Sequence, residues 1–483
     1  MLIKKPDGSY VFGFWSEGQI RALHLASLEI LERVGVRVQD SEALRIFAEA
    51  GAFVDGDLVR IPAGMVRDAL SGPPERVVLA DRNGSRKVYL EPGKISFGAG
   101  CGQPYFMDPQ SREIRLAEEK DAEKMAAMAQ YAPNIDFVAC LAGSRGSLAD
   151  LCCFRAVRAC CIKPVVVRAA SSNNMRILLE MAAASAAGGR DGLRRNPSLA
   201  FVLKGEPPLI YDAETTRQIF LAAENGIPVV FAPVIIPGKT APAKIIGSLA
   251  LGNAAVLSGL VLHQLKHWGA PFIYGIEFAF CEGEHSSAAG PEVAMMQALA
   301  AQIAQFYGLP AWGSYGTTDS FAVDAQAGAE AIFFTLVAAL GGANLAFGGG
   351  ELGSGTVGSP AKVLFDDECI SFTKHFLKGI ELSEETLALE VIERVGPGGS
   401  FLAEEHTFRY FKKETWYPSF LNRKPLKTWL EEGIIKTIAD LVSDRAAEVL
   451  ETFNVEKLPD SVLAEMDRII DKAGDGTLYT GGN

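Results

Sequence analysis

Aromatic, glycine and acidic residues follow three apolar segments in the second half of the chain. These segments are Phe272–Phe278 (FIYGIEF), Ala311–Gly316 (AWGSYG) and Asn344–Glu351 (NLAFGGGE), and each precedes a stretch with helical spacing. An aromatic ring attracts positive charge through its quadrupole and needs no hydrogen bond to do so. Rings beside carboxylates therefore suit a cationic ligand, and we place the candidate site where these segments end.

Strand and helix patterns alternate regularly from residue 137 to residue 378. Apolar segments predict strands, and segments with helical spacing between them predict helices. The predicted strands are 137–141, 165–168, 199–203, 229–231, 272–274, 311–314 and 345–347, and the predicted helices lie near 148–159, 172–187, 213–225, 243–268, 291–307, 325–340 and 360–378. Such repeats with short loops predict a parallel sheet covered by helices.

An eighth strand is available at Ile95–Phe97 or at Tyr105–Met107. Eight units favour an α/β fold closed into a (β/α)8 TIM barrel, in which the carboxyl ends of all strands meet at one mouth. An open doubly wound sheet is the alternative, and it would place the ligand at a topological switch point. We expect the barrel over 95–378, a mixed cap of helices and short strands over 1–94, and a helical extension over 379–483.

The candidate site residues lie at the predicted carboxyl ends of strands. The aromatic ones are Phe97, Tyr105, Tyr274, Phe278, Trp312, Tyr315 and Phe347. A cavity that binds a cation between these rings is one interpretation. The other is that the rings fill the barrel as ordinary core residues, as aromatic side chains commonly do. The sequence leaves both open.

The glycine-rich run Gly348–Gly355 lacks the Lys-Ser/Thr of a phosphate-binding loop and the spacing of a dinucleotide fingerprint. Without side chains at Gly348, Gly349 and Gly350, the backbone would leave room for a bulky flat group to approach. A plain flexible loop is the alternative.

Composition argues against several classes of partner. The net charge is −12, and no stretch of the sequence concentrates Lys and Arg, so we expect no nucleic-acid partner. No segment has the roughly 18 to 20 uninterrupted apolar residues of a membrane span, and the amino terminus has no apolar leader, so we expect a cytoplasmic protein. The pair His263 and His267 lacks the glutamate of a zinc protease, and the paired cysteines Cys152-Cys153 and Cys160-Cys161 fall on one helix. We therefore expect no metal site and reduced thiols.

Several motifs in order resemble the trimethylamine methyltransferase family. They are Gly341–Leu345, the run Gly348–Gly355, the acidic segment Phe365–Glu368, Gly379–Glu381, Glu384–Leu387, Val395–Phe401 (VGPGGSF) and Glu405–Thr407, with Val323–Gln326 compatible. The resemblance is most specific over about 340–410. It implies a TIM barrel that transfers a methyl group from a methylamine to Co(I) of a separate corrinoid protein. The founding branch carries pyrrolysine. This chain has none, so it looks like the non-pyrrolysine branch that demethylates quaternary amines.

The resemblance also implies roles for particular residues. Glu277, Glu351 and Glu206 are candidates to balance the charge of a quaternary ammonium, with Glu277 and Glu351 positioning it. Arg168 or His406 could hold a substrate carboxylate. Gly348, Gly349 and Gly350 would form the loop that the corrinoid approaches. Cobalamin would come from the partner, because the chain has no Asp-x-His-x-x-Gly motif of its own.

We expect glycine betaine as the first choice of substrate, then proline betaine, carnitine or a related amine. The alternatives are a zinc-dependent corrinoid methyltransferase acting on another methyl donor, and a noncatalytic protein that binds quaternary amines. A homo-oligomer is possible.

Overall fold

A computed structural model describes residues 2–4, 10–141, 146–205, 208–282, 285–431 and 436–474. Its centre is an eight-stranded parallel sheet in the order β17-β15-β13-β12-β11-β8-β22-β21. The edge strands β17 and β21 meet through a parallel bridge between Tyr274 and Ala311, where the Tyr274 N–H donates to the Pro310 carbonyl at 2.9 Å. The sheet is thereby closed into a barrel, which confirms the predicted fold.

The strands of the barrel match the predicted positions closely. They are β8 (Ser96–Gly100), β11 (Phe137–Cys140), β12 (Val165–Val167), β13 (Leu199–Leu203), β15 (Val229–Phe231), β17 (Phe272–Tyr274), β21 (Trp312–Ser314) and β22 (Leu345–Gly349). The first candidate for the eighth strand thus enters the barrel. The second becomes β9 (Tyr105–Met107), in a small sheet with β10 (Ile114–Leu116), β23 (Glu351–Leu352) and β24 (Val357–Gly358).

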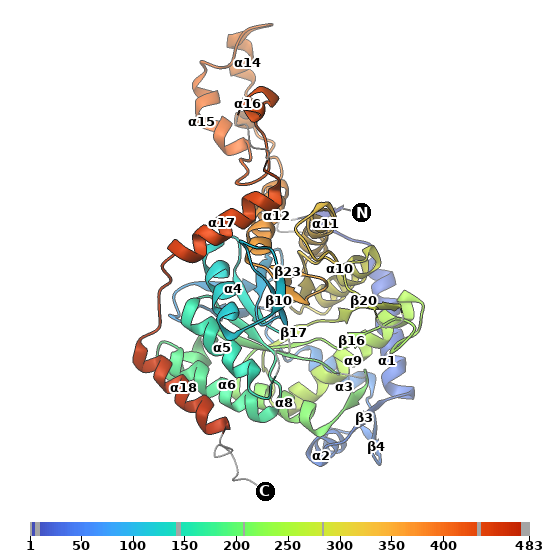
Figure 1. Cartoon of the computed structure of the whole chain (residues 1–483). Coiled ribbons are helices and arrows are strands. Elements are labelled where there is room, and N and C mark those ends of the chain that lie inside the picture. Colours follow the sequence, from blue (N-terminus) through green and yellow to red (C-terminus); the bar gives the residue numbers. More distant parts are fainter. Residues whose placement is uncertain are drawn as a thin grey trace.

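Helices surround the barrel (Figure 1). They are α4 (Glu119–Tyr131), α5 (Ala149–Cys160), α6 (Ser172–Ser185), α7 (Gly189–Arg195), α8 (Ala213–Asn225), α9 (Ile245–Lys266), α10 (Pro291–Phe306), α11 (Ala325–Gly341) and α12 (Pro360–Leu377). Helix α9 is long and apolar enough to cross a membrane, but 78% of its most apolar window is buried in the fold. Its composition therefore reflects its place between the barrel and the amino-terminal helices.

Alternate residues of the barrel strands fill its interior. Phe137, Val166, Val202, Ile273 and Leu345 belong to this inner core. A hairpin of β6 (Val77–Ala80) and β7 (Lys87–Leu90) contributes to the same core and closes the end opposite the mouth, where the Ala80 N–H donates to the Pro197 carbonyl at 2.8 Å. The hairpin thus covers the interior at the amino ends of the strands.

The amino-terminal segment packs against the outer side of the barrel helices. It contains β1 (Leu2–Lys4), β2 (Tyr10–Phe12), α1 (Glu17–Arg33), β3 (Val36–Val38), α2 (Ser41–Glu49), β4 (Phe53–Asp55), β5 (Leu58–Arg60) and α3 (Ala63–Leu70). Strand β14 (Ile210–Tyr211) from the barrel region pairs with β3. Gly35 ends the turn after α1 with a positive φ of 80°, a conformation that glycine adopts without strain.

Four short helices project from the body after α12 (Figure 1). They are α13 (Glu384–Leu387), α14 (Leu389–Val395), α15 (Glu405–Glu414) and α16 (Leu426–Glu431), and we call residues 379–431 the arm. The chain then returns through α17 (Ile438–Thr452), which packs on α12 and α4, and α18 (Asp460–Gly474), which packs on α5 and α6. Ala388, whose φ is 50°, separates α13 from α14.

Candidate active site

A cavity of about 220 Å³ opens at the carboxyl end of the barrel. Its walls come from strand ends and from the loops that follow them, including β18 (Glu277–Phe278), which pairs with β16 (Val234–Ile235). Strands β19 (Phe280–Glu282) and β20 (His285–Ser287) follow β18 in the chain and pair with each other. The lining residues are Leu141, Lys204, Glu277, Phe278, Ala288, Gln297, Trp312, Ser314, Thr317, Thr318, Phe347, Gly348, Glu351, Ser354 and Gly355. The cavity is below the roughly 300 to 1,000 Å³ of drug-sized pockets, so it suits a small ligand.

Two aromatic rings stack in this cavity. Trp312 of β21 and Phe347 of the neighbouring β22 have ring centroids 5.6 Å apart and planes inclined by 15°. Trp312 also contacts Phe137, with ring centroids 6.5 Å apart. Trp312 is almost fully buried and Phe347 is half-buried, so the indole is both a core residue and a wall of the cavity.

An ion pair lies in the same cavity. The Lys204 ammonium contacts a Glu277 carboxylate oxygen at 2.6 Å, and both side chains keep about a quarter of their surface exposed. Glu277 was predicted here, whereas Lys204 was not. Lys204 directly follows Leu203 at the end of β13, so its place after a predicted barrel strand was the signal that could have found it.

A second carboxylate, Glu351 of β23, is buried in the cavity wall. Its Oε1 accepts a hydrogen bond from Gln103 Nε2 at 2.6 Å. Burial raises the pKa of Glu351 to about 7, although the bond from Gln103 opposes the shift. Glu351 is therefore partly protonated near neutral pH and adds less than a full negative charge.

Gln297 of α10 supplies an acceptor that the sequence did not indicate. Its Nε2 donates to the Ile276 carbonyl at 3.2 Å, which fixes the orientation of the amide. Its buried Oε1 has no hydrogen-bond partner among the residues that the structure describes. A buried acceptor without a donor is costly, so this oxygen is available to a ligand.

Three predicted aromatic residues point away from the cavity. Tyr274 packs between the barrel and α9, where its hydroxyl donates to Asn253 Oδ1 at 2.9 Å. Phe97 and Tyr315 contact each other edge to face at 4.9 Å, in the layer between the barrel and its helices. The prediction that these three rings line the cation-binding cavity is therefore wrong, because alternate residues of a strand face opposite sides.

Other predicted site residues lie elsewhere. Tyr105 lines a larger cavity of about 550 Å³ beside the amino-terminal ends of α4 and α5. Arg168 is half-buried after β12 and does not line the mouth cavity, and His406 lies on α15 in the arm, against Tyr410. Neither is placed to hold a substrate carboxylate in the mouth. Glu206 falls outside the described residues.

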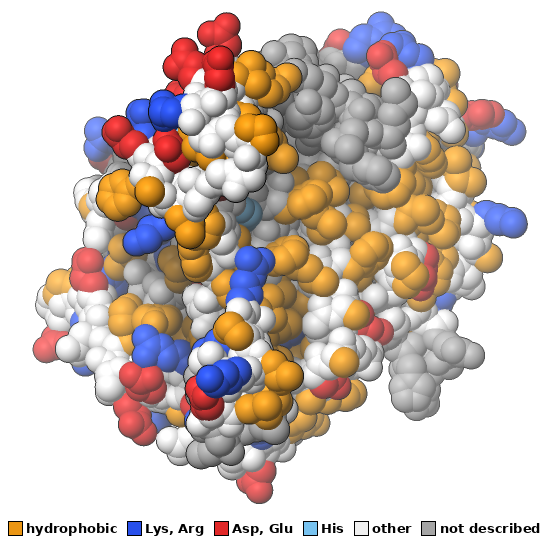
Figure 2. Space-filling view, turned by 90° about the horizontal axis from the view of Figure 1, so that it is seen from above, with side chains coloured by type: hydrophobic (Ala, Val, Ile, Leu, Met, Phe, Trp, Pro, Cys, Tyr) orange, Lys and Arg blue, Asp and Glu red, His pale blue; other side chains and the backbone are white. Residues whose placement is uncertain are grey.

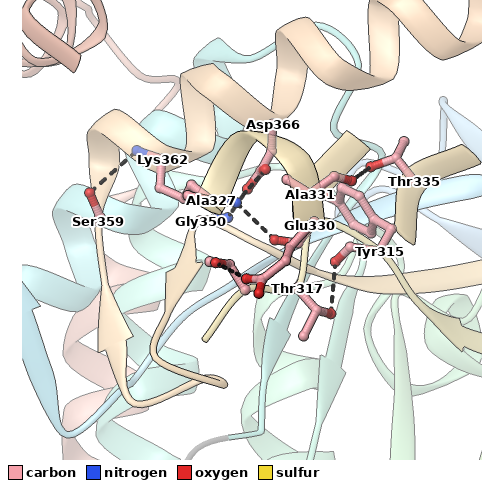
Figure 3. Close-up of polar contacts among 12 residues, drawn as sticks. Tyr315, Thr317, Ala327, Glu330, Ala331, Thr335, Gly350, Ser359, Lys362 and Asp366 are labelled. Atoms are coloured by element: carbon pink, nitrogen blue, oxygen red, sulfur yellow. Dashed lines mark hydrogen bonds and ion pairs between the residues drawn. The ribbon is translucent and has the colours of Figure 1, made fainter. Parts of the chain in front are cut away.

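The glycine run is packed rather than open. Gly348 lines the cavity, but a side chain at Gly349 would overlap the Tyr315 hydroxyl, and one at Gly350 would overlap Val363. The Gly350 N–H donates to Asp366, which also pairs with Lys362 at 2.5 Å, and both charged side chains are fully buried (Figure 3). Packing against Tyr315 and α12 is therefore sufficient reason for glycine at positions 349 and 350, and the approach of a large flat ligand to this loop stays a prediction.

No group of three or more His, Cys, Asp or Glu side chains within the described ranges is arranged to hold a metal ion. His263 is buried in α9 against Phe272, and burial lowers its pKa to about 3. Of the paired cysteines, Cys153 and Cys161 are buried and Cys152 and Cys160 are half-buried, all as free thiols. These residues lie outside the mouth cavity.

Comparison with known families identifies the scaffold and its chemistry. The family described as trimethylamine methyltransferase (MTTB) matches residues 7–476. The chain belongs to this family. A member from Desulfitobacterium hafniense, trimethylamine methyltransferase MttB, is 31% identical over 98% of this chain and 96% of its own length. A glycine betaine methyltransferase from the same species is 30% identical over 88% of this chain and 89% of its own length.

The fold is shared with a solved structure. The monomethylamine methyltransferase of Methanosarcina barkeri covers 91% of this chain and 88% of its own, with a TM-score of 0.54 at 12% identity. That likeness shows the fold alone. Because the chain belongs to the MTTB family and its named relatives are methyltransferases, it is a methyltransferase.

Proposed function

We propose that this MTTB methyltransferase moves a methyl group from a zwitterionic quaternary amine, with glycine betaine first, to Co(I) of a separate corrinoid protein. Proline betaine and carnitine come next as donors. The observation that carries this proposal is the Lys204–Glu277 ion pair beside the stacked rings of Trp312 and Phe347. The existence of a related glycine betaine methyltransferase supports the same substrate class.

The ion pair favours a substrate that carries both charges. Lys204 and Glu277 neutralise each other, so a lone cation would enter a cavity without net attraction from them. A betaine instead exchanges one ion pair for two: its carboxylate contacts the Lys204 ammonium, and its ammonium lies near Glu277. Lys204 thus takes the part that we expected of Arg168 or His406.

The aromatic pair and Gln297 complete the ammonium site. The exposed side of Phe347 and the edge of Trp312 accept a trimethylammonium group, and the unpartnered Oε1 of Gln297 adds a dipole of the right sign. Because Glu351 is partly protonated near neutral pH, it limits the negative charge around the ammonium group. None of these contacts requires the substrate to lose or gain a proton.

A quaternary nitrogen already carries its positive charge, so loss of a methyl group releases a neutral tertiary amine without a general acid. The reduced corrinoid supplies the nucleophile. The residues of this chain hold the ammonium, exclude water and align one methyl group with the open mouth. We expect the corrinoid protein to approach this mouth beside Gly348. We expect the reaction to take place in the cytoplasm.

The test is methylation of added Co(I) cobalamin by the purified protein over a panel of glycine betaine, proline betaine, carnitine, tetramethylammonium and trimethylamine. We expect betaines to be the best donors. Lys204→Met should lower kcat/KM for glycine betaine by roughly 10- to 100-fold, the cost of a hydrogen bond between charged groups. Tetramethylammonium should be used as well or better, because the variant leaves Glu277 unpaired.

The matched control is Lys266→Met, which removes a lysine that pairs with Glu42 and Glu224 away from the mouth. It should leave donor preference unchanged. Preference for trimethylamine over every betaine would refute the zwitterion proposal. Betaine binding without methylation would favour a binding protein, and loss of activity on zinc removal would favour the zinc-dependent alternative.

A further inference from the structure

Three consecutive residues between β23 and β24 adopt left-handed backbone conformations. Gly353, Ser354 and Gly355 have φ values of 56°, 51° and 86°. Glycine adopts such angles freely, whereas a residue with a Cβ atom is strained by them. Ser354 also lines the mouth cavity. Glycine would suit its backbone better, so the serine side chain must make a contact that offsets the strain.

The hydroxyl of Ser354 contacts two other loops of the mouth. It donates to one carboxylate oxygen of Asp319, which lies between β21 and α11. It accepts the N–H of Ala288, which follows β20, at 3.0 Å. The other carboxylate oxygen of Asp319 accepts the Ser287 hydroxyl at 2.6 Å. Asp319 therefore joins the loop after β20 and the β23–β24 turn to its own loop.

Asp319 is itself held in place by α11. The Glu330 carboxylate of this helix accepts the Asp319 N–H at 3.0 Å and the Thr318 hydroxyl at 2.6 Å. The backbone of the same loop supports the β23–β24 turn, because the Ser354 N–H donates to the Thr318 carbonyl at 2.8 Å. The carboxylate that holds the Ser354 hydroxyl thus has a fixed position.

The partners of Asp319 differ from those of ordinary surface carboxylates. On the face of the molecule shown in Figure 2, acidic side chains lie close to basic ones at several places. No Lys or Arg among the described residues pairs with Asp319, and its two carboxylate oxygens contact serine hydroxyls instead. A hydrogen bond to a charged acceptor is stronger than one between neutral groups. These bonds are therefore suited to fixing loop geometry.

We propose that Asp319 is a positioning residue for methyl transfer. It holds Ser354 in its left-handed conformation, and through Ser354 and Ser287 it keeps three loops closed around the head group of the substrate. The cavity-lining residues of these loops are Ala288, Thr317, Thr318, Ser354 and Gly355. The proposal rests on the proposed function for the identity of the substrate.

Loop closure matters to this reaction because alignment and exclusion of water supply most of its catalysis. A displacement of about 1 Å can lower a rate by roughly 100-fold. Released loops would let the ammonium tilt and would admit larger head groups. Asp319 acts on the substrate through Ser354, not through contact of its own.

A double-mutant cycle of Asp319 and Ser354 tests the proposal, with kcat for methylation of Co(I) cobalamin by glycine betaine as the readout. Asp319→Ala should lower kcat by roughly 10- to 100-fold and change KM less, because alignment is lost while Lys204 remains. Ser354→Gly should stay near the wild-type kcat, because glycine adopts the same φ unaided. Asp319→Ala should then have a much smaller effect in the Ser354→Gly protein. Equal losses in both backgrounds would overturn the proposal.

Conservative variants separate geometry from charge. Asp319→Asn keeps a carbonyl oxygen that accepts the Ser354 hydroxyl, so its kcat should stay close to that of the wild type. A loss as large as that of Asp319→Ala would show that charge is what matters. Ser354→Ala keeps the strain and removes the hydroxyl, so it should be less active than Ser354→Gly. The reverse order would contradict the proposal even if Asp319→Ala did not fold.

The matched control is Asp81→Ala in the hairpin of β6 and β7. Asp81 also accepts a serine hydroxyl, from Ser85 at 3.0 Å, but it lies at the other end of the barrel. This variant should lower thermal stability and leave kcat of the folded protein and the choice of donor unchanged. A fall in kcat equal to that of Asp319→Ala would show that both losses reflect general destabilisation.

Calorimetric binding gives a readout that needs no methyl acceptor. The wild type should bind glycine betaine roughly 10-fold or more tightly than its triethyl analogue, because a closed pocket discriminates against added methylene groups. Asp319→Ala should lose most of this preference. An unchanged preference would overturn the proposal. If no amine methylates cobalamin, the proposed function fails, and the binding preference still decides the role of Asp319.

Discussion

Trp312 and Phe347 lie face to face at the mouth of the barrel, with their planes 15° apart, on two neighbouring strands. The two rings differ in burial, because Trp312 is enclosed and Phe347 is half-exposed to the cavity. Substitutions at the two positions therefore separate core packing from ligand binding.

We expect Trp312→Ala to lower both stability and betaine affinity. Loss of the buried indole should cost about 3 to 5 kcal/mol of unfolding free energy. Phe347→Leu should cost less stability while weakening quaternary-amine binding, since each ring contributes roughly 0.5 to 2 kcal/mol to a bound cation. Melting temperature and calorimetric affinity measured on the same variants test this. If folded Phe347→Leu protein bound betaine with unchanged affinity, the proposal that these rings bind the ammonium group would be wrong.

Glu351 should make stability depend on pH. Its pKa is raised to about 7 from the usual 4.5, so the folded protein holds a proton that the unfolded chain releases. Stability from this group is fully present below about pH 4.5 and is lost as pH rises through 7, by up to about 3 kcal/mol. Denaturant unfolding should show that Glu351→Gln is more stable than the wild type at pH 8, and that the difference vanishes toward pH 4.5. Glu75→Gln, at an exposed carboxylate, serves as the control.

Gly349 and Tyr315 should be coupled in a double-mutant cycle. Gly349→Ala places a methyl group on the Tyr315 hydroxyl and should destabilise the protein by about 1 to 3 kcal/mol. Tyr315→Phe removes a hydroxyl that has no partner among the described residues, so alone it should be neutral or stabilising. The double variant should recover much of the loss in thermal unfolding. Strictly additive effects would show that the glycine is needed for another reason, such as approach of the corrinoid.

The buried pair Lys362 and Asp366 should be sensitive to removal of one partner. Lys362→Met leaves Asp366 charged and enclosed, with its pKa already raised by burial, and should cost about 3 to 5 kcal/mol. Lys374→Met on the same helix removes an exposed lysine and should change stability by less than about 1 kcal/mol. Equal effects of the two substitutions on urea unfolding would contradict a structural role for the pair.

The sequence by itself determined the repeating architecture. Apolar runs of three to five residues between helical segments were sufficient to place β13 at Leu199–Leu203 and β15 at Val229–Phe231. The ends of the predicted strands 272–274, 311–314 and 345–347 placed Glu277, Trp312, Phe347 and Glu351 at the mouth, because closure of any parallel barrel brings such ends together.

Only the tertiary structure decided which side chains face the cavity. Barrel strands are buried on both sides, so their sequences carry no alternation to distinguish Ile273, which points inward, from Tyr274, which points outward. The pairing of Lys204 with Glu277 joins two strand ends whose relative height depends on the register of the closed sheet. His406 is likewise indistinguishable in sequence from a site residue, and its place on the arm follows from the contacts of Glu368, which no local pattern contains.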